Sequence, residues 1–176
     1  AWRVAGYDVP AVSVNVSFRR LHDQQLLSHL QHLDISPGTL SFELLESIFL
    51  DELDDIVRWN IDQIRDMGID INIDDFGTGH ASIISLLKLR PKWFKLDRAF
   101  LDDLTTSPSQ RRLVRSIIDI GKSLDIKVVA EGVESIEQAG ILRELGCDIL
   151  QGFALARPMP AAELEAFLRQ RIRRAS

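Results

Sequence analysis

Six short apolar runs recur along the chain, and longer segments of mixed character separate them. Runs of four to six mostly apolar residues are typical of strands buried on both faces. The longer segments carry apolar residues at three- and four-residue steps, which is the pattern of a helix with one buried face. The order is therefore strand, helix, strand, helix throughout, with strands expected at Ala11–Val16, Leu40–Leu45, Ile69–Ile73, Trp93–Leu96, Lys127–Ala130 and Asp148–Phe153.

Punctuation residues support the helices between these strands. Gly68 follows a periodic apolar segment, where a glycine in left-handed conformation commonly ends a helix. Ser107 and Pro108 have the order of an N-cap and a first helical residue. Ser135, followed three residues later by Gln138, has the spacing of a capping box.

The alternation predicts an α/β fold with a parallel sheet covered by helices, either an open doubly wound sheet or a closed barrel. Each strand ends near a polar side chain, and in a barrel all strand ends face one cavity, whereas an open sheet uses mainly two or three. A Gly-x-Gly-x-x-Gly fingerprint is also absent. A TIM-like (β/α) barrel is therefore favoured, with a polar ring made of Asn15, Glu43, Asp74, Asp75, Lys95, Glu131 and Gln151.

The strand count falls short of a complete barrel. A closed barrel of this type has eight strands, and the pattern accounts for six of the eight βα units. Residues 1–6 read as the last turn of a helix. We therefore expect residues 1–176 to be one N-terminally truncated domain that dimerises, or depends on missing strands, and is inactive alone.

Composition and charge narrow the function classes. The net charge of −5 disfavours a nucleic acid polymer or an anionic membrane surface as partner. Apolar residues make up 45% of the chain, yet no apolar run approaches the roughly 18 residues that span a bilayer. The single cysteine, Cys147, reads as a structural thiol and fits a cytoplasmic location. The basic residues from Arg169 to Arg174 are interpreted as the solvated end of a last helix.

Carboxylates converging on one cavity repel each other unless a cation lies among them. Oxygen ligands without a cysteine or histidine cluster favour Mg²⁺, Mn²⁺ or Ca²⁺ over Zn²⁺. His29 and His32 could form a pair one helical turn apart, but a solvated helix face is the preferred reading.

The neighbouring Asp74 and Asp75 serve one site only where their strand breaks up, and the following Phe76-Gly77-Thr78-Gly79 supplies that break. One of these aspartates could bridge two ions, as in metal-assisted phosphoryl displacement. Lys95 could neutralise a phosphate oxygen or orient a water molecule, or form an internal salt bridge to either aspartate. Arg157, beyond the last strand, could clamp a phosphate or form a surface salt bridge.

Taken in order, these segments resemble the EAL-domain phosphodiesterases that hydrolyse cyclic di-GMP in bacteria. The similarity covers essentially the whole chain and rests on six motifs: Ser13-Val14-Asn15-Val16-Ser17, Glu43-Leu44-Leu45-Glu46-Ser47, Asp74-Asp75-Phe76-Gly77-Thr78-Gly79, Phe94-Lys95-Leu96-Asp97-Arg98, Ala130-Glu131-Gly132-Val133-Glu134, and Gln151-Gly152-Phe153 with Arg157-Pro158.

The resemblance implies metal-dependent hydrolysis of cyclic di-GMP to linear pGpG, a reaction linked to biofilm and motility signalling. It implies that one or two Mg²⁺ or Mn²⁺ ions are held by Asn15, Glu43, Asp74, Asp75 and Glu131. It further implies that Lys95, Asp75 and Glu131 carry the catalysis, that Glu46 anchors the loop after Asp75, and that Gln151, Glu134 and Arg157 contact the substrate.

Three departures from the family pattern stand out. The Glu-Ala-Leu segment that gives the family its name is absent from these residues, Leu45 replaces a threonine, and His80 stands where tyrosine is common. The leading hypothesis is a cyclic di-GMP phosphodiesterase. The alternative is a degenerate module that binds cyclic di-GMP or a protein partner as a receptor. Members of this family often carry sensory or GGDEF modules upstream, so such a partner domain is also possible.

Overall fold

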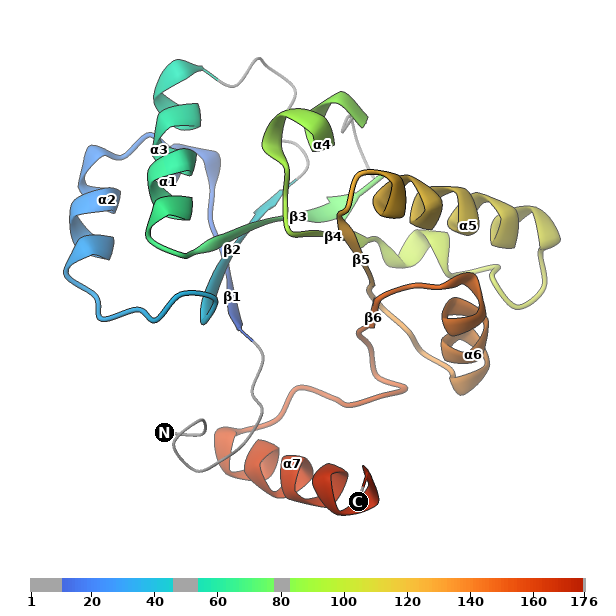
Figure 1. The fold of residues 1–176 in the computed structure, drawn as a ribbon. Coiled ribbons are helices and arrows are strands. Elements are labelled where there is room, and N and C mark those ends of the chain that lie inside the picture. The colour runs from blue at the N-terminus through green and yellow to red at the C-terminus, as the bar shows by residue number, and fades with distance from the viewer. Residues whose placement is uncertain (1–10, 46–53, 78–82, 176) are drawn as a thin grey trace.

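The computed structural model describes residues 11–45, 54–77 and 83–175, and these form one curled parallel sheet with helices around it (Figure 1). The sheet has six strands in the order β1-β2-β3-β4-β5-β6. Because each strand pairs in parallel with the next one in sequence, the strand order never reverses, as it would in an open doubly wound sheet. The prediction of a barrel-type sheet built from six βα units is confirmed. The strands are β1 (Val12–Asn15), β2 (Leu40–Leu45), β3 (Asp70–Phe76), β4 (Trp93–Leu96), β5 (Lys127–Ala130) and β6 (Ile149–Leu150).

The helices lie mainly along the outer side of the curl, and the last one lies on its open side (Figure 1). The three helix boundaries predicted at Gly68, Ser107 and Ser135 are confirmed. The Ser107 hydroxyl accepts a hydrogen bond from the Gln110 amide at 3.2 Å, and Ser135 with Gln138 forms a complete capping box. The helical elements are α1 (Phe18–Leu21), α2 (Gln24–Gln31), α3 (Asp55–Asp66), α4 (Ile83–Leu89), the 3-10 turn η2 (Arg98–Phe100), α5 (Pro108–Ser123), α6 (Ile136–Leu145) and α7 (Ala161–Ala175).

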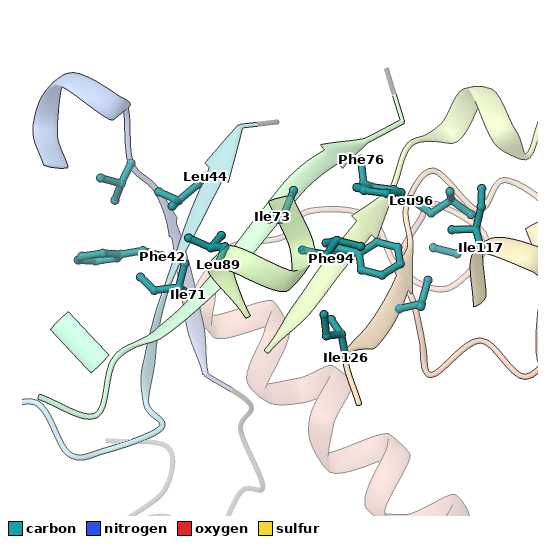
Figure 2. Close-up of a cluster of buried hydrophobic side chains, with 14 of the residues drawn as sticks. Phe42, Leu44, Ile71, Ile73, Phe76, Leu89, Phe94, Leu96, Ile117 and Ile126 are labelled. Atoms are coloured by element: carbon teal, nitrogen blue, oxygen red, sulfur yellow. The ribbon is translucent and has the colours of Figure 1, made fainter. Parts of the chain in front are cut away.

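The two faces of the sheet have different chemistry. The face toward the helices is apolar and forms the core that Figure 2 shows, with Phe94 fully buried and its ring 4.7 Å from that of Phe76. Burying a side chain of this size contributes about 2–3 kcal/mol. Because side chains alternate along a strand, the residues between these apolar positions point to the inside of the curl. There β2 and β4 place Glu43 and Lys95, which are both buried.

Two strand boundaries differ from the prediction by more than one residue. We expected the third strand to end at Ile73, but β3 continues to Phe76, because its pairing with β4 resumes after a local irregularity. We expected the last strand to reach Phe153, but β6 ends at Leu150. At Gly152 the chain lies so close to the backbone of Val133 that an added Cβ would be 2.2 Å from its carbonyl oxygen. This close approach draws the segment away from the sheet.

Within the described ranges, no helix is both long and apolar enough to cross a membrane. Cys147 is partly buried, and its thiol lies 3.4 Å from the carbonyl oxygen of Val128 and 3.3 Å from that of Ile149. Burial raises the pKa of this thiol, so it stays protonated as a packed side chain would. Residues 1–6, which we expected to end a helix, lie outside the described residues.

Candidate functional site

Three carboxylates meet at the C-terminal ends of β3 and β5. Asp74, Asp75 and Glu131 each offer an oxygen atom, and these oxygens lie within 4.8 Å of one another. Asp74 and Asp75 both reach the site because the strand is distorted at this point. Asp75 has a φ of 54°, and the register between β3 and β4 shifts between Ile73 and Phe76. The strand is therefore distorted at Asp75 itself, inside β3, before the Phe76-Gly77-Thr78-Gly79 segment where the sequence placed the break.

Lys95 lies at the centre of this acidic group. Its Nζ is 2.8 Å from Glu43 Oε2, 3.3 Å from Asp74 Oδ1 and 3.6 Å from Glu131 Oε2. Burial alone would lower the pKa of Lys95, but the hydrogen bond and charge of Glu43, with the charges of Asp74 and Glu131, raise it overall. Lys95 is therefore a charged ammonium. A salt bridge from Lys95 to Asp74 or Asp75 was considered from the sequence. The structure has the salt bridge to Asp74, and it adds ion pairs with Glu43 and Glu131 that were not predicted.

Glu131 is the most exposed of the carboxylates bound to Lys95, with 36% of its side chain open to solvent. Burial raises the pKa of Glu131, and the charges of Asp74 and Asp75 raise it further, while Lys95 lowers it. Burial is the larger cause and the neighbouring negative charges add to it, and a cation bound among these carboxylates would offset both.

The two remaining predicted ligands lie toward the β1 edge of the sheet. Glu43 is 7% exposed and held by Lys95, outside the three-carboxylate group. Asn15, at the end of β1, is paired in register with Glu43 and is exposed. The polar ring thus extends along the sheet, and among the described carboxylates the group of three whose oxygen atoms come together lies in its β3–β5 part.

A cavity of about 500 Å³ adjoins the carboxylates. Its wall includes Asp75 and Glu131 and all three residues expected to contact a substrate, Gln151, Glu134 and Arg157. Arg157 stacks on an exposed aromatic ring, with its guanidinium carbon 4.5 Å from the ring centre of Phe153. That is a cation–π contact, so the surface salt bridge considered for this arginine is not the arrangement observed.

Three further residues of the cavity wall, Asp97, Arg98 and Phe153, were not predicted as site residues. All three belong to family motifs, so the available signal was their place within Phe94-Lys95-Leu96-Asp97-Arg98 and Gln151-Gly152-Phe153. Pattern and periodicity do not say which side chains of a motif face a cavity.

Other sequence expectations have simpler outcomes. His29 and His32 are exposed, which agrees with a solvated helix face. His22 lies 2.6 Å from Asp54, away from the strand-end cluster. Arg169 pairs with Glu165 at 2.6 Å along α7. Glu46, the expected loop anchor, and His80 lie outside the described residues.

The donor set fits a hard divalent cation. Three carboxylates, Glu43, Asp74 and Glu131, contact the Lys95 ammonium. Asp75 joins Asp74 and Glu131 as a further carboxylate, so the site has excess negative charge. Oxygen-only ligands of this kind suit Mg²⁺ or Mn²⁺. Such an ion can bind a phosphate oxygen and lower the pKa of a bound water molecule.

Comparison with known proteins also indicates a phosphodiesterase family. The family model of the EAL domain matches residues 1–158. The chain is 35% identical over 178 residues to the cyclic di-GMP phosphodiesterase PdeR of Escherichia coli, and this match covers 99% of the chain and 27% of that protein. It is 36% identical over 173 residues to the cyclic di-GMP phosphodiesterase NbdA of Pseudomonas aeruginosa, covering 94% of the chain and 22% of that protein.

Two solved structures share the fold. The PaMucR phosphodiesterase in complex with c-di-GMP matches with a TM-score of 0.81 and 35% identity, covering 93% of this chain and 67% of that one. The EAL domain of Mycobacterium smegmatis DcpA matches with a TM-score of 0.86 and 27% identity, covering 96% and 78%. The chain spans only about a fifth to a quarter of the length of the curated relatives it matches, between 21% and 27%.

Proposed function

Because this chain belongs to the EAL domain family, we propose that it carries a phosphodiesterase site that hydrolyses cyclic di-GMP to linear pGpG. The observation that carries the proposal is the cluster of Asp74, Asp75 and Glu131, which lies around a buried lysine and opens into a cavity. Family membership alone would also suit a receptor. A receptor has no need of a crowded, charge-unbalanced carboxylate cluster, whereas a metal-dependent hydrolase does.

We assign the cation to the strand ends. Asp74, Asp75 and Glu131 would hold one or two Mg²⁺ or Mn²⁺ ions, with Glu43 and Asn15 completing the set from β2 and β1. When bound, the ion would activate water and polarise the phosphate. Lys95 supports this assignment because its ammonium contacts Glu43, Asp74 and Glu131 and offsets part of their negative charge, so that these carboxylates can lie close together.

The cavity beside the cluster would receive the dinucleotide. Gln151 and Glu134 offer hydrogen-bonding groups to a guanine edge, and Arg157 offers a guanidinium to a phosphate. Because Arg157 is stacked on Phe153, its orientation is partly fixed before the substrate binds.

Lys95, Asp75 and Glu131 would perform the chemistry. Water adds to the phosphorus atom, the bond from phosphorus to the 3′ oxygen breaks, and that oxygen takes up a proton. Asp75 and Glu131 would orient the attacking water through their carboxylate oxygens. Lys95 would stabilise the negative charge that develops on the phosphate oxygens.

The wider context of the site follows from the family. Glu46 would anchor the loop after Asp75. The protein would work in the cytoplasm, as a homodimer and in some arrangements beside a GGDEF or sensory module, in signalling that affects biofilm and motility. Self-association is favoured by α4, on which Ile83, Ile84 and Leu87 are 49%, 60% and 52% exposed.

The test is turnover of cyclic di-GMP in the presence of Mg²⁺ or Mn²⁺, followed by chromatography of the products. It should use the longest available form of the protein that includes this chain. Release of pGpG that stops on adding a chelator supports the proposal. Binding of cyclic di-GMP without any product in either metal would refute it and favour the receptor.

A further inference from the structure

The short turn η2, which follows β4, packs against the loops on both sides of the carboxylate cluster. An added Cβ on Gly77 would lie 2.5 Å from Cζ of Phe100. An added Cβ on Gly132 would lie 2.5 Å from Cβ of Arg98. Real Cβ atoms do not approach other carbon atoms so closely, so each contact requires glycine. In each pair, the glycine and the side chain packed on it leave no room for an added Cβ atom.

The two glycines lie next to the metal-site carboxylates along the chain. Gly77 is two residues after Asp75 and has a φ of 96°, while Gly132 directly follows Glu131 and has a φ of 73°. Both glycines lie where the regular strands end: Gly77 follows Phe76, the last residue of β3, and Gly132 follows β5. Backbone pairing reaches their neighbours, since Phe76 pairs with Leu96 and the Glu131 amide donates to the Leu96 carbonyl at 3.1 Å. The close contacts at the two glycines add a second constraint on the segments that carry Asp75 and Glu131.

The turn η2 is itself held in place from three directions. The Asp97 carboxylate accepts a hydrogen bond from the amide of Ala99 at 2.8 Å and caps the turn. From α5, Gln110 donates to the carbonyl of Phe100 at 2.9 Å. From α6, Gln138 donates to the carbonyl of Leu101 at 3.0 Å. A turn of three residues anchored to two helices is a rigid support.

We infer that η2 sets the separation between Asp75 and Glu131, with Phe100 and Arg98 as positioning residues that act through Gly77 and Gly132. This inference rests on the proposed function, because it assumes that the carboxylates bind a divalent cation. The Phe100 side chain has no oxygen or nitrogen atom to offer a cation, so it would act only through the loop. Arg98 would act through its aliphatic stem, separately from any contact of its guanidinium with a substrate in the cavity.

The first experiment measures Mn²⁺ affinity by electron paramagnetic resonance in the longest available form of the protein that includes this chain, with urea unfolding measured on the same samples. Loss of an outer support of a metal ligand typically weakens metal affinity about 10- to 100-fold. We expect Phe100→Ala to weaken Mn²⁺ binding about 10-fold and to broaden the spectrum of the bound ion, with Phe100→Leu in between. Leu113→Ala, at an exposed position of α5, is the control and should leave Mn²⁺ affinity unchanged.

A double-mutant cycle tests the contact itself. Gly77→Ala should weaken Mn²⁺ binding more than Phe100→Ala does, because the new methyl group strikes the ring. Combining the two changes should restore part of the affinity, because the ring is gone. Gly140→Ala, where an added Cβ meets nothing within 4 Å, is the matched glycine control.

Arg98 gives an independent comparison. Arg98→Met keeps an unbranched stem over Gly132 and should bind Mn²⁺ as the parent does, whereas Arg98→Ala should bind it about 10-fold more weakly. A parent chain that binds no Mn²⁺ would overturn the proposed function, and this inference with it. If the parent binds Mn²⁺, unchanged affinity and spectra in Phe100→Ala and Phe100→Leu, or strictly additive effects in the cycle, would overturn the inference alone.

Discussion

The two sides of the polar ring differ in how closely their side chains are held. On the β3–β5 side, Asp74, Asp75 and Glu131 come within 4.8 Å of one another. On the β1 side, Asn15 belongs to a strand that is exposed along its whole length and has a neighbour only in β2 among the described residues. Similar ligand types thus occupy a closely supported position on one side and an open one on the other. Ligands contribute to affinity in proportion to how well they are held before the ion arrives, so the two sides should not contribute equally.

The largest effect should come from the supported side. Asp74→Asn removes a charge from the cluster while leaving its shape nearly unchanged. We expect Mn²⁺ affinity, measured by electron paramagnetic resonance, to fall by at least about 100-fold, the upper range for loss of even an outer-shell partner. Asp66→Asn, an exposed carboxylate on α3, is the matched control. Retained affinity in the Asp74 variant would mean that the cluster is not the cation site.

Removal of the buried ammonium tests whether the cluster depends on Lys95. Lys95→Met leaves Glu43, Asp74 and Glu131 facing one another without their shared positive charge. The free energy of unfolding should fall by about 3 kcal/mol in the presence of a chelator, because removing one partner of a buried ion pair is costly. Added Mn²⁺ should restore much of this loss, and urea unfolding with and without the ion checks it. A loss that Mn²⁺ does not reverse would show that packing, not charge, is the cause.

The open side should give a smaller effect. Asn15→Ala removes a neutral oxygen from an exposed position, where a water molecule can take its place on a hard cation. We expect Mn²⁺ affinity to fall about 10-fold, by the same measurement as for Asp74→Asn. If Asn15→Ala and Asp74→Asn weakened binding equally, the contrast between the two sides would be wrong.

The smallest effect concerns an ion pair beside the β1 side. His22 Nε2 lies 2.6 Å from Asp54, whose carboxylate also caps α3 through the amide of Val57. The hydrogen bond to Asp54 raises the pKa of His22, with a further contribution from the Phe18 carbonyl. The Val57 amide, and then His22, lower the pKa of Asp54. The pair is largely solvent-exposed, so its effect on stability should be modest.

The sign of the pH dependence follows from these two shifts. The stability that His22 adds is complete below its unfolded pKa of about 6.5 and is lost as pH rises through the higher folded value. The stability that Asp54 adds is lost as pH falls through its lowered folded pKa. Urea midpoints of the parent and of His22→Gln should therefore differ most near about pH 5.5 and converge in alkaline solution. A difference that grows with pH would contradict the pairing.

The site could be predicted from the sequence as far as the residue types and their order. Glu43, Asp74, Lys95 and Glu131 each stand at the end of a strand, and period-two alternation puts Glu43 and Lys95 on the inner face. What could not be predicted is which pairs touch. The contact between Lys95 and Glu43 joins residues 52 positions apart, and it depends on the curvature that brings β2 and β4 together across β3.

The bulge at Asp75 was likewise beyond the sequence. Adjacent aspartates in a regular strand would point to opposite faces, so both enter the site only through a positive φ at Asp75 and a register shift against β4. The glycines at 77 and 132 were visible in the motifs, but their partners Phe100 and Arg98 were not, because a glycine reveals a close approach without naming what approaches.

Several features could be predicted from the amino-acid sequence alone: the strand–helix order, the predicted helix caps, the parallel sheet and the residue types at the strand ends. These depend on local periodicity and on side-chain chemistry, which are both written along the chain. Three other features became visible in the tertiary structure. Three carboxylates form a cluster, and Lys95 links Glu43 to them. The turn η2 packs against the glycines that follow Asp75 and Glu131. Those features depend on the curl of the sheet and on contacts of a few ångströms between distant segments, which no local pattern encodes.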